Sequence, residues 1–169
     1  MAYCRGEKRL TDILIDQIEL RPVCLDDAQQ IFMWRNDPRI VMRGSSQREI
    51  PWEEHITWLK HSLNEQEENL LFIVKYIKTS IGLVRFTRKL DDTAEISAYI
   101  VDEYTAKGIG TRAICIGCST AFIKWPVRSI VACIRNDNPG GCRAFSKAGF
   151  VVVKTDRCPA GHTAFVLYK

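Results

Sequence analysis

The 169-residue sequence has no long apolar run and no strong excess of either charge. No segment approaches the roughly 20 apolar residues that a membrane-spanning helix needs, and the first residues lack the apolar core of a secretion signal. The net charge is a modest +4, and Lys and Arg do not cluster into a patch typical of nucleic-acid binding. These absences predict that neither a membrane nor a nucleic acid is a partner.

Repeats, low-complexity segments and linkers are also lacking, which predicts a single domain. Residues 1–16 include the mixed-charge stretch CRGEKR and are expected to form an N-terminal tail. Residues 17–169 are long enough for one domain with its own hydrophobic core.

Cysteine is plentiful by comparison, with an odd count of seven and scattered spacing: Cys4, Cys24, Cys115, Cys118, Cys133, Cys142 and Cys158. This pattern predicts reduced thiols in a cytoplasmic protein. Cys115 and Cys118 form a CxxC pair, but the pair falls inside a predicted helix and has no second CxxC or histidine pair beside it. We therefore expect thiols that pack in the interior, and no metal site.

Periodicity predicts an α/β domain with a mixed sheet. Strand patterns occupy residues 18–23, 69–76, 80–90, 93–101, 128–135, 150–155 and 162–169. Helical patterns occupy residues 27–36, 51–63, 109–124 and 139–149. Pro38 is expected to end the first helix, and residues 43–50 to form a polar loop.

Gly108 and Gly110 stand where a predicted strand ends and a predicted helix begins. The first N–H groups of a helix lack partners and the helix dipole is positive there, so such a junction attracts anions. Glycine lets a phosphate approach the backbone, and the N–H groups of residues 106–111 could surround it, with Lys107 nearby. A plain strand-to-helix turn would contain the same glycines, but their spacing favours phosphate binding.

Two other phosphate-binding patterns fit less well. The Walker pattern GxxxxGK[ST] is missing. Gly108, Gly110 and Ala113 do match the dinucleotide pattern G-x-G-x-x-G/A, and Asp137 lies beyond the next strand. That fold needs several parallel strands in series, whereas the strands upstream are predicted to form an antiparallel meander. A dinucleotide fold is therefore not expected.

The segment 105–110, TAKGIG, resembles the acetyl-CoA-binding loop of the GNAT acetyltransferase superfamily, which reads Arg/Gln-x-x-Gly-x-Gly/Ala. Both glycines match, and Thr105 replaces the usual Arg or Gln. The segment 138–150, NPGGCRAFSKAGF, is similar to a second family pattern in which an Asn is followed by an aromatic residue and Gly-Phe. The order of elements from Ile18 onward also resembles that of the family.

The resemblance implies a GNAT fold: a mixed, mostly antiparallel sheet of about seven strands, splayed between 93–101 and 128–135 and flanked by about four helices. It implies acetyl-CoA as cosubstrate, with the pantetheine arm in the gap between the splayed strands. It also implies direct attack on the thioester by the primary amine of a small-molecule acceptor. The coenzyme-binding residues are then expected to be Tyr99, Ile100, Val101, Ala106, Lys107, Gly108, Ile109, Gly110, Thr111, Asn138 and Phe145.

Amide formation needs a neutral amine, a polarised thioester carbonyl and a proton for the leaving thiolate. Many family members donate that proton from a tyrosine at the position of Phe145, which has no proton to give. Glu95 is the best-placed candidate base because strand alternation puts it on one face with Ser97 and Tyr99. His55 is a second candidate. Both residues can also be explained without catalysis: Glu95 as an exposed glutamate on a strand, and His55 as a solvated histidine at the side of a helix.

Two further segments, WRNDP (34–38) and WEEHITWL (52–59), together resemble the GNAT branch that N-acetylates nucleotide-linked amino sugars, as in pseudaminic acid biosynthesis. Trp34 and Trp52 could stack on a sugar or base, Arg35 could contact a phosphate, and His55 could also contact the acceptor. Core packing explains the tryptophans equally well, and for Trp34 better.

Three alternatives remain open at the level of the sequence. Aminoglycoside 6'-N-acetyltransferases share the KG-x-G loop and the KAGF ending, and acetyltransferases of protein N-termini share a similar WxNDP segment. A non-catalytic acyl-CoA sensor would explain Phe145. The positive net charge favours an anionic nucleotide sugar over a polycation. We expect a monomer or a homodimer.

Overall fold

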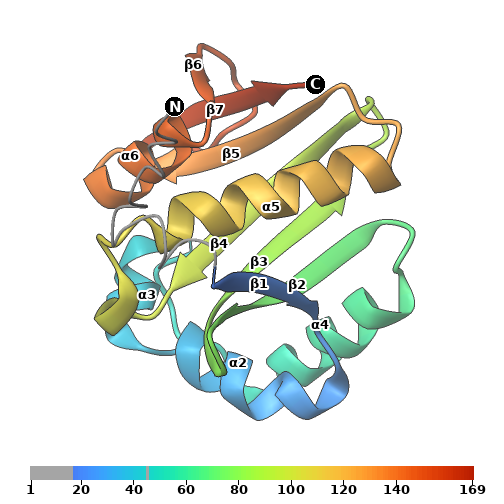
Figure 1. The fold of residues 1–169 in the computed structure, drawn as a ribbon, viewed down its shortest axis with the longest axis vertical. Coiled ribbons are helices and arrows are strands. Elements are labelled where there is room, and N and C mark those ends of the chain that lie inside the picture. The colour runs from blue at the N-terminus through green and yellow to red at the C-terminus, as the bar shows by residue number, and fades with distance from the viewer. Residues whose placement is uncertain (1–16, 45) are drawn as a thin grey trace, which may run out of the picture.

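The protein folds around a single seven-stranded sheet (Figure 1). The structure, a computed structural model, describes residues 17–44 and 46–169. The strands are β1 (Ile18–Pro22), β2 (Asn69–Tyr76), β3 (Thr79–Arg88), β4 (Thr93–Ile100), β5 (Ser129–Arg135), β6 (Val151–Val153) and β7 (His162–Tyr168). The helices are α2 (Ala28–Arg35), α3 (Pro38–Arg43), α4 (Trp52–Asn64), α5 (Ile109–Lys124) and α6 (Pro139–Lys147), with 3-10 turns η1 (Leu25–Asp27) and η2 (Asp102–Tyr104).

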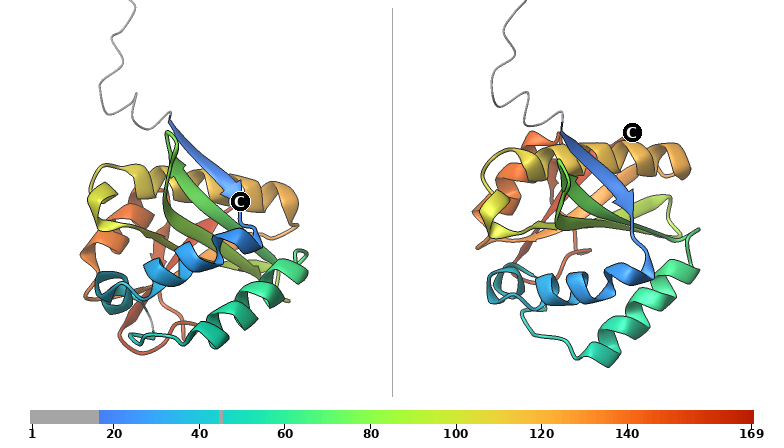
Figure 2. Two further views of the ribbon diagram at one scale, coloured as in Figure 1. Left: turned by 90° about the horizontal axis from the view of Figure 1, so that it is seen from below. Right: turned by 60° about the horizontal axis from the view of Figure 1, so that its bottom comes forward.

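The sheet is mixed and mostly antiparallel, as the resemblance implied. Its strand order is β1-β2-β3-β4-β5-β7-β6, and β4 with β5 is the parallel pair. Helix α5 covers one face of the sheet, and α2 and α4 cover the other (Figure 2). One apolar cluster therefore lies beneath α5 and α6, and a second lies between the sheet and the α2–α4 pair.

The N-terminal part differs from expectation at Pro38. The expected helix does end before this residue, at Arg35, but Pro38 also begins a further helix, α3. Asp37 caps α3 by accepting a hydrogen bond from Arg39 N at 2.9 Å. Proline is well suited to the first turn of a helix because it has no N–H to leave unpaired. Helix α3 was not predicted, because a proline was interpreted only as a signal that ends a helix.

The described residues contain no helix that is both long enough and apolar enough to cross a membrane. The longest helix, α5, has 16 residues and lies against the sheet.

Gly82 in β3 permits a close approach between β3 and β4. A Cβ built on Gly82 would overlap the carbonyl oxygen of Tyr99 on the neighbouring strand. Gly82→Ala should therefore displace β4 and lower the free energy of unfolding by about 2 kcal/mol, measured by denaturant titration. Gly44→Ala is the control, because its Cβ would have an ordinary contact at 3.4 Å. Equal stability of the two variants would contradict the close approach.

Candidate functional site

The sheet opens between β4 and β5. These strands pair at three positions, where Thr93, Ala94 and Glu95 face residues 129–131, and then diverge. A cavity of about 1060 Å³ lies where the strands diverge, and it reaches from the N-terminus of α5 to Arg85 on β3 and to Ile40 and Arg43 on α3. The splay expected between 93–101 and 128–135 is therefore present.

The turn between β4 and α5 has the geometry expected of an anion site. Gly108 is the N-cap of α5 and has a φ of 80°. Ala106, with a φ of 60°, is also in the left-handed region, which an alanine rarely adopts. Ala106, Gly108, Gly110 and Thr111 all line the cavity. The unpaired N–H groups of the first turn of α5 therefore begin at the cavity wall.

Two residues expected at this turn are placed differently. Lys107 donates from Nζ to the carbonyl oxygen of Glu103 at 2.8 Å and lies over the ring of Tyr104, so its ammonium group turns back toward η2. Ile109 is 2% exposed, and its side chain belongs to the core beneath α5. Neither residue lines the cavity.

The open edge of β4 presents backbone groups to the gap. Val101 N donates to Ile81 O at 2.9 Å, so this N–H points toward β3 and away from the gap. Backbone groups alternate in direction along a strand, so the N–H groups of Ala98 and Ile100 point toward β5, with which they do not pair. Of the three residues expected to pair with pantetheine, Ile100 alone directs its N–H into the gap, and Tyr99 also lines the cavity.

Asn138, just before α6, and Phe145, on α6, line the cavity on the side opposite β4. Asn138 caps this helix, and its Oδ1 accepts from Gly141 N at 2.9 Å. Phe145 is 3% exposed and packs edge-on against Phe150, with ring centroids 5.0 Å apart. Both residues line the cavity, and each also has a clear structural role.

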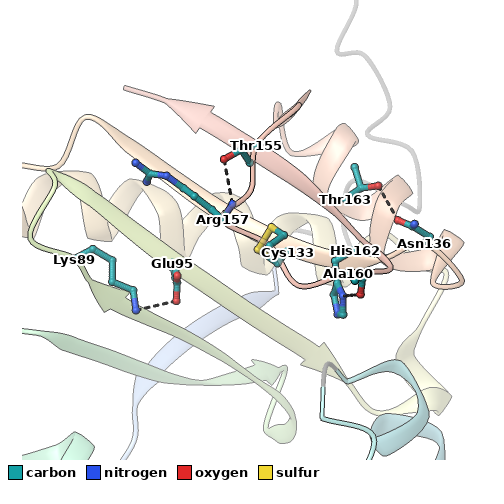
Figure 3. Close-up of a disulfide and its surroundings, with 10 residues drawn as sticks. Lys89, Glu95, Cys133, Asn136, Thr155, Arg157, Ala160, His162 and Thr163 are labelled. Atoms are coloured by element: carbon teal, nitrogen blue, oxygen red, sulfur yellow. Dashed lines mark hydrogen bonds and ion pairs between the residues drawn. A yellow bond between two sulfur atoms is a disulfide. The ribbon is translucent and has the colours of Figure 1, made fainter.

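Glu95 lies at the point where β4 and β5 separate, and it lines the cavity. Its carboxylate is 3.0 Å from Lys89 Nζ, and its side chain is 53% exposed (Figure 3). Water can therefore reach the carboxylate, and a proton taken up there can leave to solvent.

His55 does not lie where a catalytic base is needed. Its side chain is fully buried, and Nε2 lies 2.9 Å from Ala28 O, which links α4 to α2. Burial lowers the pKa of His55, which therefore stays neutral. The ring is surrounded by Phe32, Trp52 and Trp58, and it lines no cavity found among the described residues. The expectation that His55 acts as a base or contacts the acceptor is therefore corrected, because apolar packing encloses it.

The WRNDP segment is mainly structural. Trp34 is 8% exposed and packs edge-on against Tyr99 in the core. Asn36 exchanges two hydrogen bonds with the backbone of Ile50, at 2.9 and 3.0 Å, and so ties α2 to the start of α4. Arg35 is the member of this segment that lines a cavity.

Trp52 also lies outside both cavities, where it packs edge-on against Phe32 at the N-terminal end of α4. Two residues that were not predicted from the sequence, Trp58 on α4 and Arg85 on β3, line the same smaller cavity as Arg35. An arginine within the apolar run of β3 was the signal that could have identified Arg85.

Cys133 on β5 forms a disulfide with Cys158 in the loop between β6 and β7 (Figure 3). The expectation of seven reduced thiols is therefore wrong for this pair, and the cysteine pattern no longer supports a cytoplasmic location. Their Cα atoms lie 5.5 Å apart although 25 residues separate them in sequence. Arg157 and Pro159, on either side of Cys158, line the cavity, so the disulfide holds this loop against the gap.

The large cavity is cationic. Glu95 and Asp137 are the carboxylates among the described residues that line it. The basic side chains that line it are Arg43, Arg85, Arg135, Arg143, Lys147 and Arg157. Over residues 17–44 and 46–169, no group of three or more His, Cys, Asp or Glu side chains is placed to hold a metal ion.

A sheet that opens beside a glycine turn at the N-terminus of a helix is the arrangement that the GNAT resemblance implied. The chain belongs to this family, because the family described as Acetyltransferase (GNAT) domain matches residues 17–151. The protein is accordingly an acetyl-CoA-dependent N-acetyltransferase. No curated protein matches the chain by sequence.

Several solved structures share the fold. AAC(6')-Ib, in complex with ribostamycin and coenzyme A, has a TM-score of 0.80 and 19% identity, over 91% of this chain and 94% of that chain. Spermidine N-acetyltransferase from Vibrio cholerae, with CoA and spermine, has a TM-score of 0.75 and 18% identity, over 90% and 96%. The microcin C7 self-immunity acetyltransferase MccE, with acetyl-CoA and AMP, has a TM-score of 0.72 and 18% identity, over 91% and 93%. At these identities the likeness concerns the fold alone.

Proposed function

We propose that this acetyltransferase acetylates the primary amine of a nucleotide-linked amino sugar. The observation that carries this proposal is the charge of the cavity, which is lined by six basic side chains and two carboxylates. Three of the six, Arg43, Arg135 and Arg157, are in ion pairs, and among the described residues Arg85, Arg143 and Lys147 are not. Such a cavity attracts anions and repels polycations such as aminoglycosides and polyamines. The MccE structure supports the proposal to the extent that a protein of the same fold holds a nucleotide, AMP, together with acetyl-CoA.

In this proposal the coenzyme lies along the gap between β4 and β5. The pyrophosphate binds the N–H groups of the first turn of α5, next to Gly108 and Gly110. The pantetheine arm pairs with the free edge of β4 at Ala98 and Ile100, and Asn138 and Phe145 line the opposite wall. A backbone N–H of this edge polarises the thioester carbonyl when the amine attacks.

The side chains around the gap suit a weakly basic amine. The amine of an amino sugar is bonded to a carbon that oxygen-bearing carbons flank, so it is less basic than a lysine amine and more of it is neutral near pH 7. Glu95, in contact with solvent, accepts the proton that the amine loses, through a water molecule. Phe145 donates none to the leaving thiolate, so water or the acceptor supplies that proton.

A panel of acceptors tests the proposal. The nucleotide-linked amino sugar should give a kcat/KM on the order of a hundredfold above that of the bare amino sugar, because the nucleotide contributes binding energy away from the reacting amine. An aminoglycoside and a peptide N-terminus serve as the competing acceptors. Preferred turnover of either would overturn the nucleotide-sugar acceptor and leave the acetyltransferase assignment intact. Absence of turnover with every amine, despite acetyl-CoA binding, would favour the sensor.

A further inference from the structure

A second, smaller cavity adjoins the large one on the face of the sheet that α2 and α4 cover. It has a volume of about 230 Å³. Arg85, Ser97 and Tyr99 line both cavities, so the smaller cavity continues the acceptor side of the gap. Its remaining walls include Arg35 from α2 and Trp58 from α4.

The smaller cavity holds positive charge that the protein does not neutralise. Arg35, Arg48 and Arg85 line it, and no carboxylate does so among the described residues. Arg48 forms an ion pair with Glu54, with 2.6 Å between nitrogen and oxygen. Over the part of the chain that the structure describes, Arg35 and Arg85 form neither an ion pair nor a side-chain hydrogen bond.

Both unpaired arginines contact the ring of Trp58. The guanidinium carbons of Arg35 and Arg85 each lie 5.5 Å from the centroid of the Trp58 ring. Cation–π attraction orients both groups, but it leaves their N–H donors free. Glu95, the carboxylate whose field reaches Arg85, is already paired with Lys89. Burial lowers the pKa of Arg85, and the neighbouring positive charge of Arg35 lowers it further.

Tyr99 adds a further donor. Its hydroxyl is buried and has no hydrogen-bond partner within residues 17–44 and 46–169. Burial raises the pKa of Tyr99, so its proton is retained and available for donation. An unsatisfied buried hydroxyl and an uncompensated pair of arginines both cost stability, and a bound oxyanion would remove both costs.

We propose that this cavity binds the phosphate or diphosphate group of the acceptor, held by Arg35, Arg85 and the Tyr99 hydroxyl. The inference rests on the proposed function in taking the acceptor to be nucleotide-linked. Guanidinium groups bind phosphate through paired N–H donors, and Trp58 orients both of them before the ligand arrives. Since Arg85 and Tyr99 also line the large cavity, a phosphate held here positions the rest of the acceptor toward the gap between β4 and β5.

Calorimetry with inorganic pyrophosphate tests this site directly. The protein is first saturated with CoA, so that the coenzyme occupies the turn at Gly108 and pyrophosphate cannot bind there. Pyrophosphate should then bind the wild type, and Arg85→Gln and Arg35→Gln should each weaken it on the order of tenfold or more. Tyr99→Phe should weaken it by a smaller factor. In kinetics, the KM for the acceptor should rise in both arginine variants and the KM for acetyl-CoA should not.

Arg128→Gln is the matched control. Arg128 immediately precedes β5, its side chain is 87% exposed beside Asp92, and it lines neither cavity. The Arg128→Gln substitution removes the same charge as the other two arginine variants and should leave pyrophosphate binding unchanged. Arg35→Gln, on a helix, also provides a variant independent of the sheet should Arg85→Gln fail to fold, and the Tm of each variant checks this.

The outcomes separate the two proposals. Failure of pyrophosphate to bind the CoA-saturated wild type, or equal binding by wild type and both arginine variants, would overturn the phosphate site. Pyrophosphate binding that depends on both arginines, combined with a preference for aminoglycosides or peptides in the acceptor panel, would retain the anion site and overturn the nucleotide-sugar acceptor.

Discussion

Gly108→Val is expected to weaken acetyl-CoA binding on the order of a hundredfold, which corresponds to about 3 kcal/mol. Gly108 caps α5 with a φ of 80°, at the wall of the cavity. A valine there places a branched side chain where the pyrophosphate approaches the first N–H groups of the helix. Several charge-assisted hydrogen bonds are then lost together. Isothermal titration calorimetry with acetyl-CoA measures the change.

The left-handed conformation strains valine wherever it occurs, so the control must carry the same strain elsewhere. Gly161 has a φ of 78°, and a Cβ there would meet nothing within 4 Å. Gly161→Val should therefore lower the free energy of unfolding by about 1–2 kcal/mol, through the same backbone strain as Gly108→Val. It should leave the affinity for acetyl-CoA unchanged. Equal acetyl-CoA affinity of Gly108→Val and Gly161→Val would remove the anion site at α5.

Cys158→Ser is expected to lower the free energy of unfolding by about 3 kcal/mol, because the disulfide closes a loop of 25 residues in the unfolded chain. For a domain of this size the loss corresponds to a fall in Tm of roughly 6–12 °C. The loop that carries Arg157 and Pro159 into the cavity also loses its attachment to β5. The KM for the acceptor should therefore rise. Calorimetry or thermal fluorescence measures the first effect, and initial rates measure the second.

Cys115→Ser is the matched control, because Cys115 is a free thiol on α5. Its Tm should stay within about 2 °C of the wild type, as expected for a partly exposed position. Treatment of the wild type with a reductant should reproduce the Cys158→Ser effect and leave the variant itself unchanged. If the Tm of the wild type is the same with and without the reductant, the Cys133–Cys158 disulfide does not stabilise the protein.

Local patterns were sufficient for the fold and for the conformation of the turn at Gly108. All seven strands lie within residue ranges predicted from the alternation and length of apolar runs, or overlap them by nearly their full length. The turn at Gly108 was predicted because the residues that form it, 105–110, are contiguous in sequence. The exception was α3, where Pro38 both ends one helix and begins the next.

The acceptor side was predicted less well, because helix periodicity does not say which neighbour a side chain meets. Trp34, Trp52 and His55 were expected at the acceptor, yet they pack between helices or against the sheet. Asn36 shows the same ambiguity, since its hydrogen bonds to Ile50 explain its presence without any ligand. Aromatic and polar residues in such segments can either pack in the interior or bind a ligand. How deeply each side chain is buried in the structure distinguishes the two roles.

The sequence by itself determined the order of elements, the GNAT family and the glycine turn that begins α5, since each depends on residues close together in the chain. Only the tertiary structure decided which distant residues meet. It joined Cys133 to Cys158, and it brought Arg35, Trp58 and Arg85 from α2, α4 and β3 to one cavity. Contacts of this kind depend on how helices pack across the sheet, and spacing along one chain carries no record of that packing.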